Sequence, residues 1–140
     1  MTSSWTSAST ADGGVSALGT NITNMSVIGV AAGYATAVLL YRLARRWRQD
    51  VPVAAVGAIS FIAAVIGTVS AAMGFVLEYS IGGASSTSLG TVATYMFGTH
   101  VLIGVGEGII TALTVMAVVR ARPDLVYLLR TNPARTLVTA

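Results

Sequence analysis

The sequence predicts an all-α fold, a polytopic membrane helical bundle with about three transmembrane helices. Of its 140 residues, 54% are hydrophobic and only 9% are charged, whereas roughly a quarter of the residues in soluble proteins are charged. The mean hydropathy is +0.78, and three apolar stretches are each long enough to cross a bilayer, which takes about 20 helical residues. Such a chain needs lipid to keep its apolar surface out of water.

The charged residues argue for membrane topology signals. The chain has eight basic residues, all of them arginines, and five acidic residues, so its net charge is +3. The arginines fall in two clumps, which is typical of loops that flank transmembrane helices and not of a nucleic-acid-binding stripe. The chain has no cysteine, which excludes disulfides, thiolate metal sites and cysteine nucleophiles.

Composition divides the chain into three parts. Residues 1–24 are rich in Ser, Thr, Gly and Ala and lack a basic residue, so we expect a flexible or interfacial lead-in and not a secretory signal. Residues 25–124 form the expected membrane domain. Residues 125–140 form the expected tail.

The first expected span covers about residues 25–43. Arginines follow it, and Trp47 lies among them, as is typical where a helix leaves the hydrocarbon. Gly29 and Gly33 form a GxxxG pair, which permits close approach of a second helix.

The second expected span covers residues 51–77. Asp50 and Pro52 are suited to its start, because Asp caps helices and Pro fits their first turn. At this length the helix is expected to tilt or to extend beyond the membrane. Small residues recur every three or four positions and predict one closely packed face: Gly57, Ser60, Ala64, Gly67, Ala71 and Gly74.

The third expected span covers residues 99–120, and the apolar stretch before it raises a question of length. Apolar character begins at Leu89, which leaves more residues than one upright helix needs. Either one long tilted helix is present, or a short fourth segment at 89–98 ends in a break near Gly98. We favour the break, because Gly90 and Gly98 bracket the short segment.

Arginine placement predicts the orientation. Four arginines separate the first two spans and four follow the third, while residues 78–88 contain none. We expect a multi-pass protein of the plasma membrane, and the positive-inside rule predicts that its N-terminus lies outside and its C-terminus in the cytoplasm.

The third span contains the only histidine, His100, and one of the five acidic residues, Glu107, and ionisable residues inside a membrane span are functional candidates by default. They are seven residues apart, about 10 Å along a helix, too far for both to bind one metal ion. We expect His100 near the outer interface, bonded to a neighbouring helix. Glu107 is either a structural carboxyl bonded to a neighbouring helix or backbone, or a gating or coupling group.

Gly104, Gly106 and Gly108 surround Glu107. They lack the preceding strand of a dinucleotide-binding motif, and we expect them to let other backbones approach the carboxyl. The sequence offers neither a nucleophile with its base nor a close pair of acids, so we expect no enzyme.

Two stretches resemble the CbiM/NikM family, the substrate-capture membrane components of cobalt and nickel energy-coupling factor (ECF) transporters. The first runs from Asp12 to Gly29 and contains Asn21 and Asn24. The second runs from Thr99 to Leu113 and is followed by Arg122-Pro123-Asp124-Leu125.

This resemblance implies a helical membrane protein that hands Co²⁺ or Ni²⁺ to a transmembrane coupling subunit driven by ATPase subunits, often alongside cobalamin biosynthesis. Structural or coupling roles are therefore expected for His100, Glu107, the asparagines at 21 and 24, and the glycines at 104, 106 and 108.

The sequence also departs from that family. Its members usually have six or seven helices and begin Met-His, with metal ligands in the first half. Here Thr2 follows Met1, and His100 is the only histidine. The matching portion corresponds to the C-terminal half, so this chain is expected to bind no metal by itself.

Three interpretations follow from that departure: a truncated copy or one partner of a split capture subunit, an assembly or regulatory protein that docks onto transporter subunits, or an inert remnant.

Overall fold

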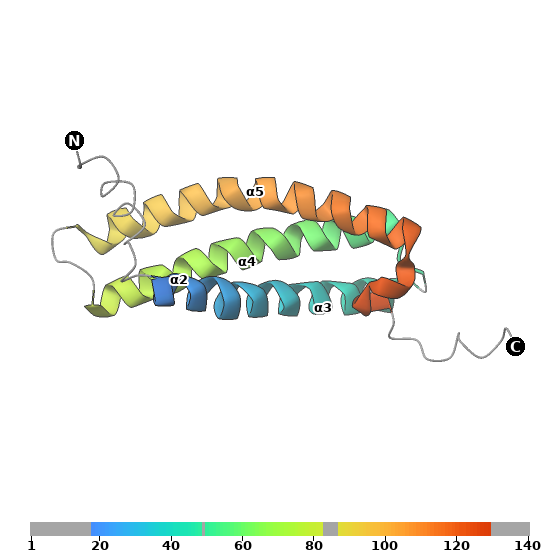
Figure 1. Cartoon of the computed structure of the whole chain (residues 1–140), viewed down its shortest axis with the longest axis horizontal. Coiled ribbons are helices and arrows are strands. Elements are labelled where there is room, and N and C mark those ends of the chain that lie inside the picture. The colour runs from blue at the N-terminus through green and yellow to red at the C-terminus, as the bar shows by residue number, and fades with distance from the viewer. Residues whose placement is uncertain (1–17, 49, 83–86, 130–140) are drawn as a thin grey trace, which may run out of the picture.

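A computed structural model describes residues 18–48, 50–82 and 87–129 of the chain (Figure 1). The elements are the helix α2 (Leu18–Thr23), the π-helical turn η2 (Asn24–Gly29), the helices α3 (Val30–Trp47), α4 (Val53–Gly82) and α5 (Leu89–Ala121), and the 3₁₀ turns η3 (Pro123–Leu125) and η4 (Tyr127–Leu129).

The predicted all-α membrane architecture is confirmed. Three helical segments are long and apolar enough to cross a membrane, namely Asn24–Trp47, Val53–Gly82 and Leu89–Ala121. The described residues contain no strand. Helices suit this composition, because each backbone N–H and C=O finds its partner within the same segment.

The expected break near Gly98 is wrong. α5 is one continuous helix of 33 residues, and residues 89–98 form its first turns. A glycine within a helix costs about 1 kcal/mol, whereas each backbone group left unpaired in hydrocarbon costs several. Continuity therefore wins. At about 1.5 Å per residue α5 is roughly 50 Å long, so it must tilt or extend beyond the hydrocarbon.

The first helical segment begins earlier than the expected span. α2, η2 and α3 follow one another without a gap from Leu18, so the last residues of the expected lead-in are helical. The rest of that lead-in, residues 1–17, lies outside the described residues. At the other end, η3 and η4 follow α5, and residues 130–140 of the expected tail lie outside the description.

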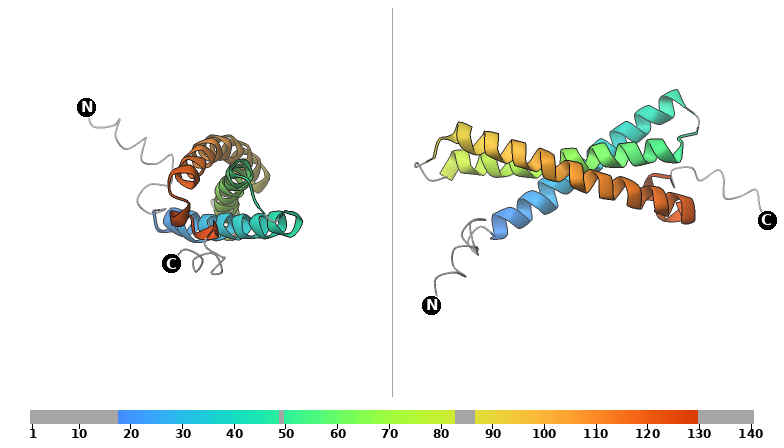
Figure 2. Two further views of the ribbon diagram at one scale, coloured as in Figure 1. Left: turned by 90° about the vertical axis from the view of Figure 1, so that its right-hand side faces the viewer. Right: turned by 90° about the horizontal axis from the view of Figure 1, so that it is seen from above.

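α4 lies in the middle of the molecule. α5 packs along one side of it, while α3 crosses its other side at an angle, as the end-on and top views show (Figure 2). In the most apolar window of each span, 28% of α4 is buried, against 6% in the first span and 11% in α5. The outer helices therefore leave most of their surface uncovered in this chain.

Glycines let α3 cross close to α4, as the GxxxG pair predicts. A Cβ atom added at Gly67 would lie 2.9 Å from the carbonyl oxygen of Gly29, and one at Gly33 would lie 3.2 Å from the carbonyl oxygen of Ala63. Real Cβ atoms are essentially never found closer than 3.0 Å to such an atom. The backbones meet at this crossing because neither helix carries a side chain there.

The small residues of α4 face two neighbours, whereas the sequence predicted one packed face. Gly67 and Gly74 face the first helical segment. Gly57 instead faces α5, where an added Cβ would lie 2.7 Å from the side chain of Met116. A central helix packed on both sides needs small residues on both sides, and this explains the continuous apolar pattern of α4.

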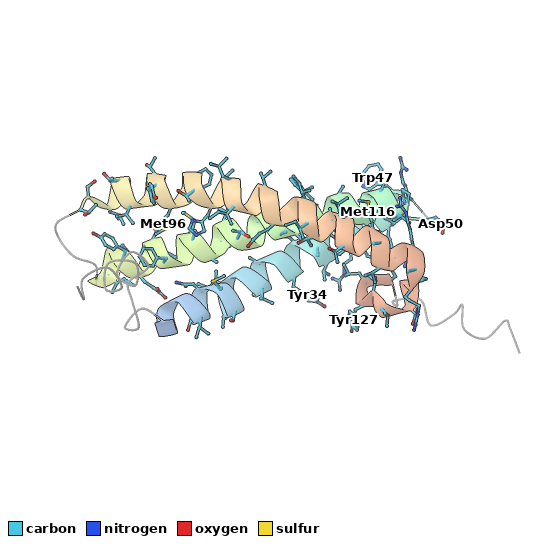
Figure 3. The ribbon with its side chains drawn as sticks, turned by 45° about the horizontal axis from the view of Figure 1, so that its top comes forward. Tyr34, Trp47, Asp50, Met96, Met116 and Tyr127 are labelled. Carbon is cyan, nitrogen blue, oxygen red and sulfur yellow. The ribbon has the colours of Figure 1, made fainter. Side chains whose placement is uncertain are left out.

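Arginines gather at one end of the bundle. α3 and α5 both end there, next to the start of α4 (Figures 1 and 3), and this end carries all six described arginines: Arg42, Arg45, Arg46, Arg48, Arg120 and Arg122. Arg122 lies beyond the last span and forms an ion pair of 2.9 Å with Asp124. This hydrogen-bonded partner raises the pKa of the exposed Arg122 guanidinium.

Candidate functional site

Glu107 lies midway along α5 and is joined to α4. The hydroxyl of Thr68 donates a hydrogen bond to its carboxyl group, yet Glu107 remains exposed at the protein surface. A carboxyl group at this depth of a membrane span is costly unless protein or water covers it. Among the described residues, the Glu107 carboxyl group therefore has one hydrogen-bond partner, and its other side is exposed.

The Thr68 hydroxyl has two acceptors within reach. Besides Glu107, the carbonyl oxygen of Ala64 lies 3.0 Å away, one turn earlier in α4. A hydroxyl carries a single proton, so the Thr68 hydroxyl shares that proton between the two acceptors. Through Thr68, the carboxyl group is linked to the backbone of α4.

The three glycines around Glu107 divide between two sides of α5. Gly104 and Gly108 are buried and face α4, where an added Cβ would lie 3.2 Å from the Cα atom of Val65 and 2.7 Å from the ring of Phe61, respectively. Gly106 has nothing within 4 Å of an added Cβ. The predicted close approach of a backbone to this region occurs on one side, and the other side is free.

His100 lies two turns before Glu107 and is half-buried. Its Nδ1 atom is 2.9 Å from the carbonyl oxygen of Met96 in the same helix, whereas the sequence analysis expected a bond to a neighbouring helix. Because a carbonyl oxygen only accepts, Nδ1 is the donor in this hydrogen bond.

A second polar contact lies toward the end of the bundle opposite the arginines. The Nδ2 atom of Asn24 donates to the Oε2 atom of Glu78 across 3.0 Å, which joins η2 to α4. Asn24 is only 3% exposed, and its Oδ1 atom is buried without a hydrogen-bond partner. Gly74 lies opposite, and a Cβ added there would lie 2.6 Å from that oxygen, so a larger residue would require the Asn24 side chain to move.

Asn21 is part of the helix α2, but its side chain is not described. Thr68 and Glu78 are partners that the sequence analysis missed. In the sequence, Glu78 stands just after an apolar stretch, and Thr68 is one of many hydroxyl residues within such stretches. Thr68 meets Glu107, and Glu78 meets Asn24, only because of the register between neighbouring helices. Residue spacing along the sequence does not reveal that register.

None of these residues forms a metal-binding cluster. Within the described part of the chain, no group of three or more His, Cys, Asp or Glu side chains lies close enough to hold a metal ion. His100 and Glu107 are bonded to different groups, one on α5 and one on α4. Of the candidate residues, Asn24, Gly104, Glu107 and Gly108 take part in contacts with α4, whereas His100 bonds within α5.

The family model described as "Cobalt uptake substrate-specific transmembrane region", CbiM, matches residues 6–125. The chain belongs to the CbiM family. CbiM proteins are membrane components of metal uptake, which agrees with the three membrane-spanning helices and with the resemblance read from the sequence.

Two curated relatives also match this CbiM chain. A protein of Archaeoglobus fulgidus named "Putative fused nickel transport protein NikMN" is 38% identical over 120 residues, which cover 83% of this chain and 36% of the relative. A protein of Haloquadratum walsbyi named "Putative metal transport protein" is 34% identical over 116 residues, 83% of this chain and 48% of the relative. No solved structure matches the chain.

The chain therefore spans between about a third and a half of the length of these relatives.

Proposed function

We propose that this chain supplies the second half of the metal-capture subunit of an ECF-type cobalt or nickel uptake transporter. In this role it would assemble with a separate chain that provides the first half and its metal ligands. The joined subunit would pass Co²⁺ or Ni²⁺ to a transmembrane coupling subunit driven by ATPases. Metal would then be bound mainly outside this chain.

The observation that carries this proposal is the exposed carboxyl group of Glu107. On insertion scales, an acidic side chain at the centre of a membrane helix costs about 3 kcal/mol. The hydrogen bond from Thr68 offsets only part of this cost. A further helix against this side of α5 would cover the carboxyl group. Gly106 leaves room for such a helix, because its surroundings are empty.

The length relationship supports the same proposal. Both relatives are two to three times longer than the aligned region, and the families that these stretches resemble usually have six or seven helices. Three spans with little buried surface fit one half of such a bundle. Their outer helices would become interior helices on assembly.

Co-expression tests the proposal. The chain should be expressed with tags, alone and with the product of any adjacent gene that carries a Met-His start and three or four spans. We expect co-purification of the two chains, and uptake of ⁶³Ni or ⁵⁷Co by cells only when both are present with the coupling and ATPase subunits. Unchanged uptake on deletion of this chain would contradict the proposal.

The same experiment separates two other roles. An assembly or regulatory protein would co-purify with the coupling subunit while the purified complex held neither cobalt nor nickel. An inert copy would bind none of these subunits.

A further inference from the structure

We propose that one flank of α5, which carries His100, Glu107 and Thr114, is the docking surface for a transmembrane helix of a separate chain. This helix places a hydrogen-bond donor beside Glu107. The inference rests on the proposed function, in which the separate chain supplies the first half of the capture subunit. A second flank of α5 stays in contact with lipid.

The packing of α5 on α4 determines how α5 is oriented. Six of its residues are buried or half-buried along a seven-residue repeat, which is the spacing of helices that pack as left-handed pairs. They are Val101, Gly104, Gly108, Thr111, Val115 and Val118. Cβ atoms added at the two glycines of this set would meet Val65 and Phe61 of α4. One flank of α5 is therefore covered within the chain.

A second seven-residue repeat begins one position earlier and lies about 100° around the helix from the first. We call it the polar seam, because every seventh residue in it has a polar side chain. It consists of His100, Ile103, Glu107, Ile110, Thr114 and Ala117. All of these except His100 are exposed. In a four-helix bundle each helix packs on two neighbours at about a right angle, so the polar seam lies where a second neighbour of α5 would pack.

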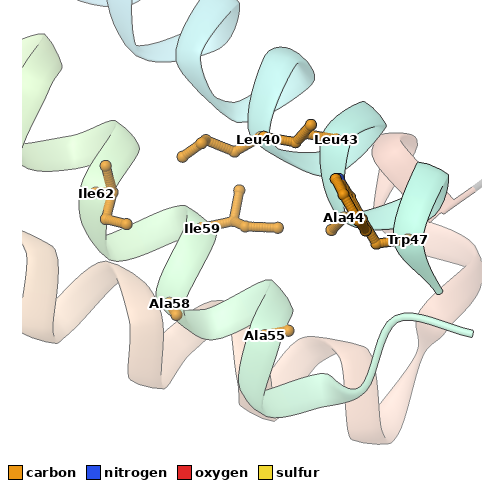
Figure 4. A pocket seen from close by; sticks show the side chains of 8 residues that line it. All are labelled: Leu40, Leu43, Ala44, Trp47, Ala55, Ala58, Ile59 and Ile62. Atoms are coloured by element: carbon orange, nitrogen blue, oxygen red, sulfur yellow. The ribbon is translucent and has the colours of Figure 1, made fainter.

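Other uncovered surfaces of the spans differ from the polar seam in their chemistry. On the other side of the α4-facing residues, α5 exposes Leu102, Val105 and Ile109. The wedge between α3 and α4 is also lined by apolar side chains, such as those of Leu40 and Ile59 (Figure 4). Apolar surfaces are stable in lipid, whereas ionisable side chains within a span usually face protein or water. The polar seam is therefore the surface whose chemistry calls for a protein neighbour.

The Glu107 carboxyl group indicates what this neighbour carries. It accepts a hydrogen bond from the Thr68 hydroxyl, which shares its proton with the carbonyl oxygen of Ala64. Its two oxygen atoms have room for further hydrogen bonds. Within the described part of the chain, no basic side chain forms an ion pair with Glu107. A donor side chain on the covering helix would supply the missing bond, as polar residues do between membrane helices.

The polar seam also restricts the position of that donor. Along the seam, the neighbours of Glu107 are Ile103 and Ile110, one turn away on either side. A single polar position between apolar ones fixes the register of a helix pair. We therefore expect the covering helix to have its donor at the level of Glu107 and apolar side chains one turn before and after it.

Photo-crosslinking in cells tests which flank is covered. p-Benzoylphenylalanine would replace Ile110 on the polar seam or Ile109 as the matched control on the apolar flank. These are adjacent residues of one type, 68% and 50% exposed. The full chain would be expressed with the first-half chain and with the coupling and ATPase subunits, and cross-linked peptides would be identified by mass spectrometry. We expect position 110, and not position 109, to cross-link to a transmembrane helix of the first-half chain.

Bulky substitutions at the same two positions measure the effect on association. Ile110→Trp should weaken association of the two chains about tenfold or more, because it overpacks a covered face. Ile109→Trp faces lipid and should weaken it by about twofold at most. Circular dichroism of each variant shows whether its helices are retained.

A double-mutant cycle tests the donor itself. Once cross-linking has identified the donor residue on the covering helix, its replacement by alanine should weaken association about tenfold. In the Glu107→Leu chain the same replacement should cause no further loss, because the donor then has no acceptor. An equal loss in both chains would show that this donor does not bind Glu107, and would overturn the assignment.

The outcomes separate this inference from the proposed function. If the two chains associate through position 109 and not through position 110, the docking surface is wrong and the proposed function stands. If position 110 cross-links to a donor-bearing helix of another transporter subunit, the docking surface stands and the proposed function is contradicted. The absence of any protein cross-link from position 110 would overturn the docking surface.

Discussion

Gly67 sets how closely the first helical segment, η2 with α3, approaches α4. Its hydrogen atoms face the carbonyl oxygen of Gly29, and an added methyl group would come within 2.9 Å of it. Backbone atoms cannot turn aside as the end of a flexible side chain can. The two helices would have to separate along the whole crossing.

Replacing Gly67 by alanine should therefore lower the free energy of unfolding by about 1–3 kcal/mol, as overpacking typically does. Unfolding in mixed detergent and dodecyl sulfate, followed by circular dichroism, measures the change. Gly98→Ala is the matched control: its Cβ has nothing within 4 Å, and a better helix former should stabilise by up to about 1 kcal/mol. Equal effects of the two variants would contradict the close crossing.

Asn24 and Glu78 offer a second test at this scale. Removing one partner of a part-buried hydrogen bond costs about 1–3 kcal/mol, so Asn24→Ala should destabilise the bundle. A double-mutant cycle with Glu78→Ala should give a coupling energy of about 0.5–3 kcal/mol. Ser80→Ala is the control, because that hydroxyl bonds only within its own helix, to Leu77. A coupling energy near zero would show that the pair contributes nothing.

At the scale of the element, α5 shows where reading a sequence succeeds and where it fails. The apolar composition predicted three membrane helices, since lipid leaves few alternatives for the backbone. The expected break at Gly98 failed because glycine weakens a helix by less than the cost of unpaired backbone groups in lipid. The sequence also could not predict which residues face each other. Thr68 and Glu107 meet only because of the register between two antiparallel helices.

Hydrogen exchange measures the continuity of α5. The amides of residues 98–102 should exchange as slowly as those of residues 103–110 in detergent micelles, because each donates to the carbonyl four residues earlier. The amides of residues 124–129, in or next to short 3₁₀ turns, should exchange much faster. Fast exchange confined to residues 98–102 would instead support a break in the helix near Gly98.

Glu107 should show opposite effects in the chain alone and in the proposed assembly. Without a partner, Glu107→Leu replaces an exposed carboxyl group by an apolar one in the membrane, and the free energy of unfolding should stay the same or rise. With a covering helix, the same change leaves polar groups of the partner unpaired, and association should weaken tenfold or more.

Glu107→Gln keeps a hydrogen-bond acceptor for Thr68 and should preserve expression. If it abolishes metal uptake while both chains remain assembled, Glu107 has a coupling role beyond packing. If Glu107→Leu lowers the stability of the isolated chain, this would argue against a partner helix that covers the exposed side of α5.

At the scale of the whole molecule, the arginines predict the orientation in the membrane. Because the chain contains no cysteine, single cysteines report access without background. Ile81→Cys, 88% exposed at the end without described arginines, should react with a membrane-impermeant maleimide added to intact cells. Asp50→Cys, at the arginine-rich end, should react only in inverted vesicles. The opposite labelling pattern would reverse the predicted topology.

The central position of α4 also bears on the order in which the protein can be made. A ribosome delivers the first span before α4 exists, so Asn24 enters the bilayer without Glu78, and Gly29 and Gly33 enter it without the surface of α4 on which they pack. The emergence of α4 supplies both at once, and α5 then docks on its remaining side. The first span must therefore wait in lipid, or beside the insertion machinery, as an unaccompanied helix until the second has been synthesised.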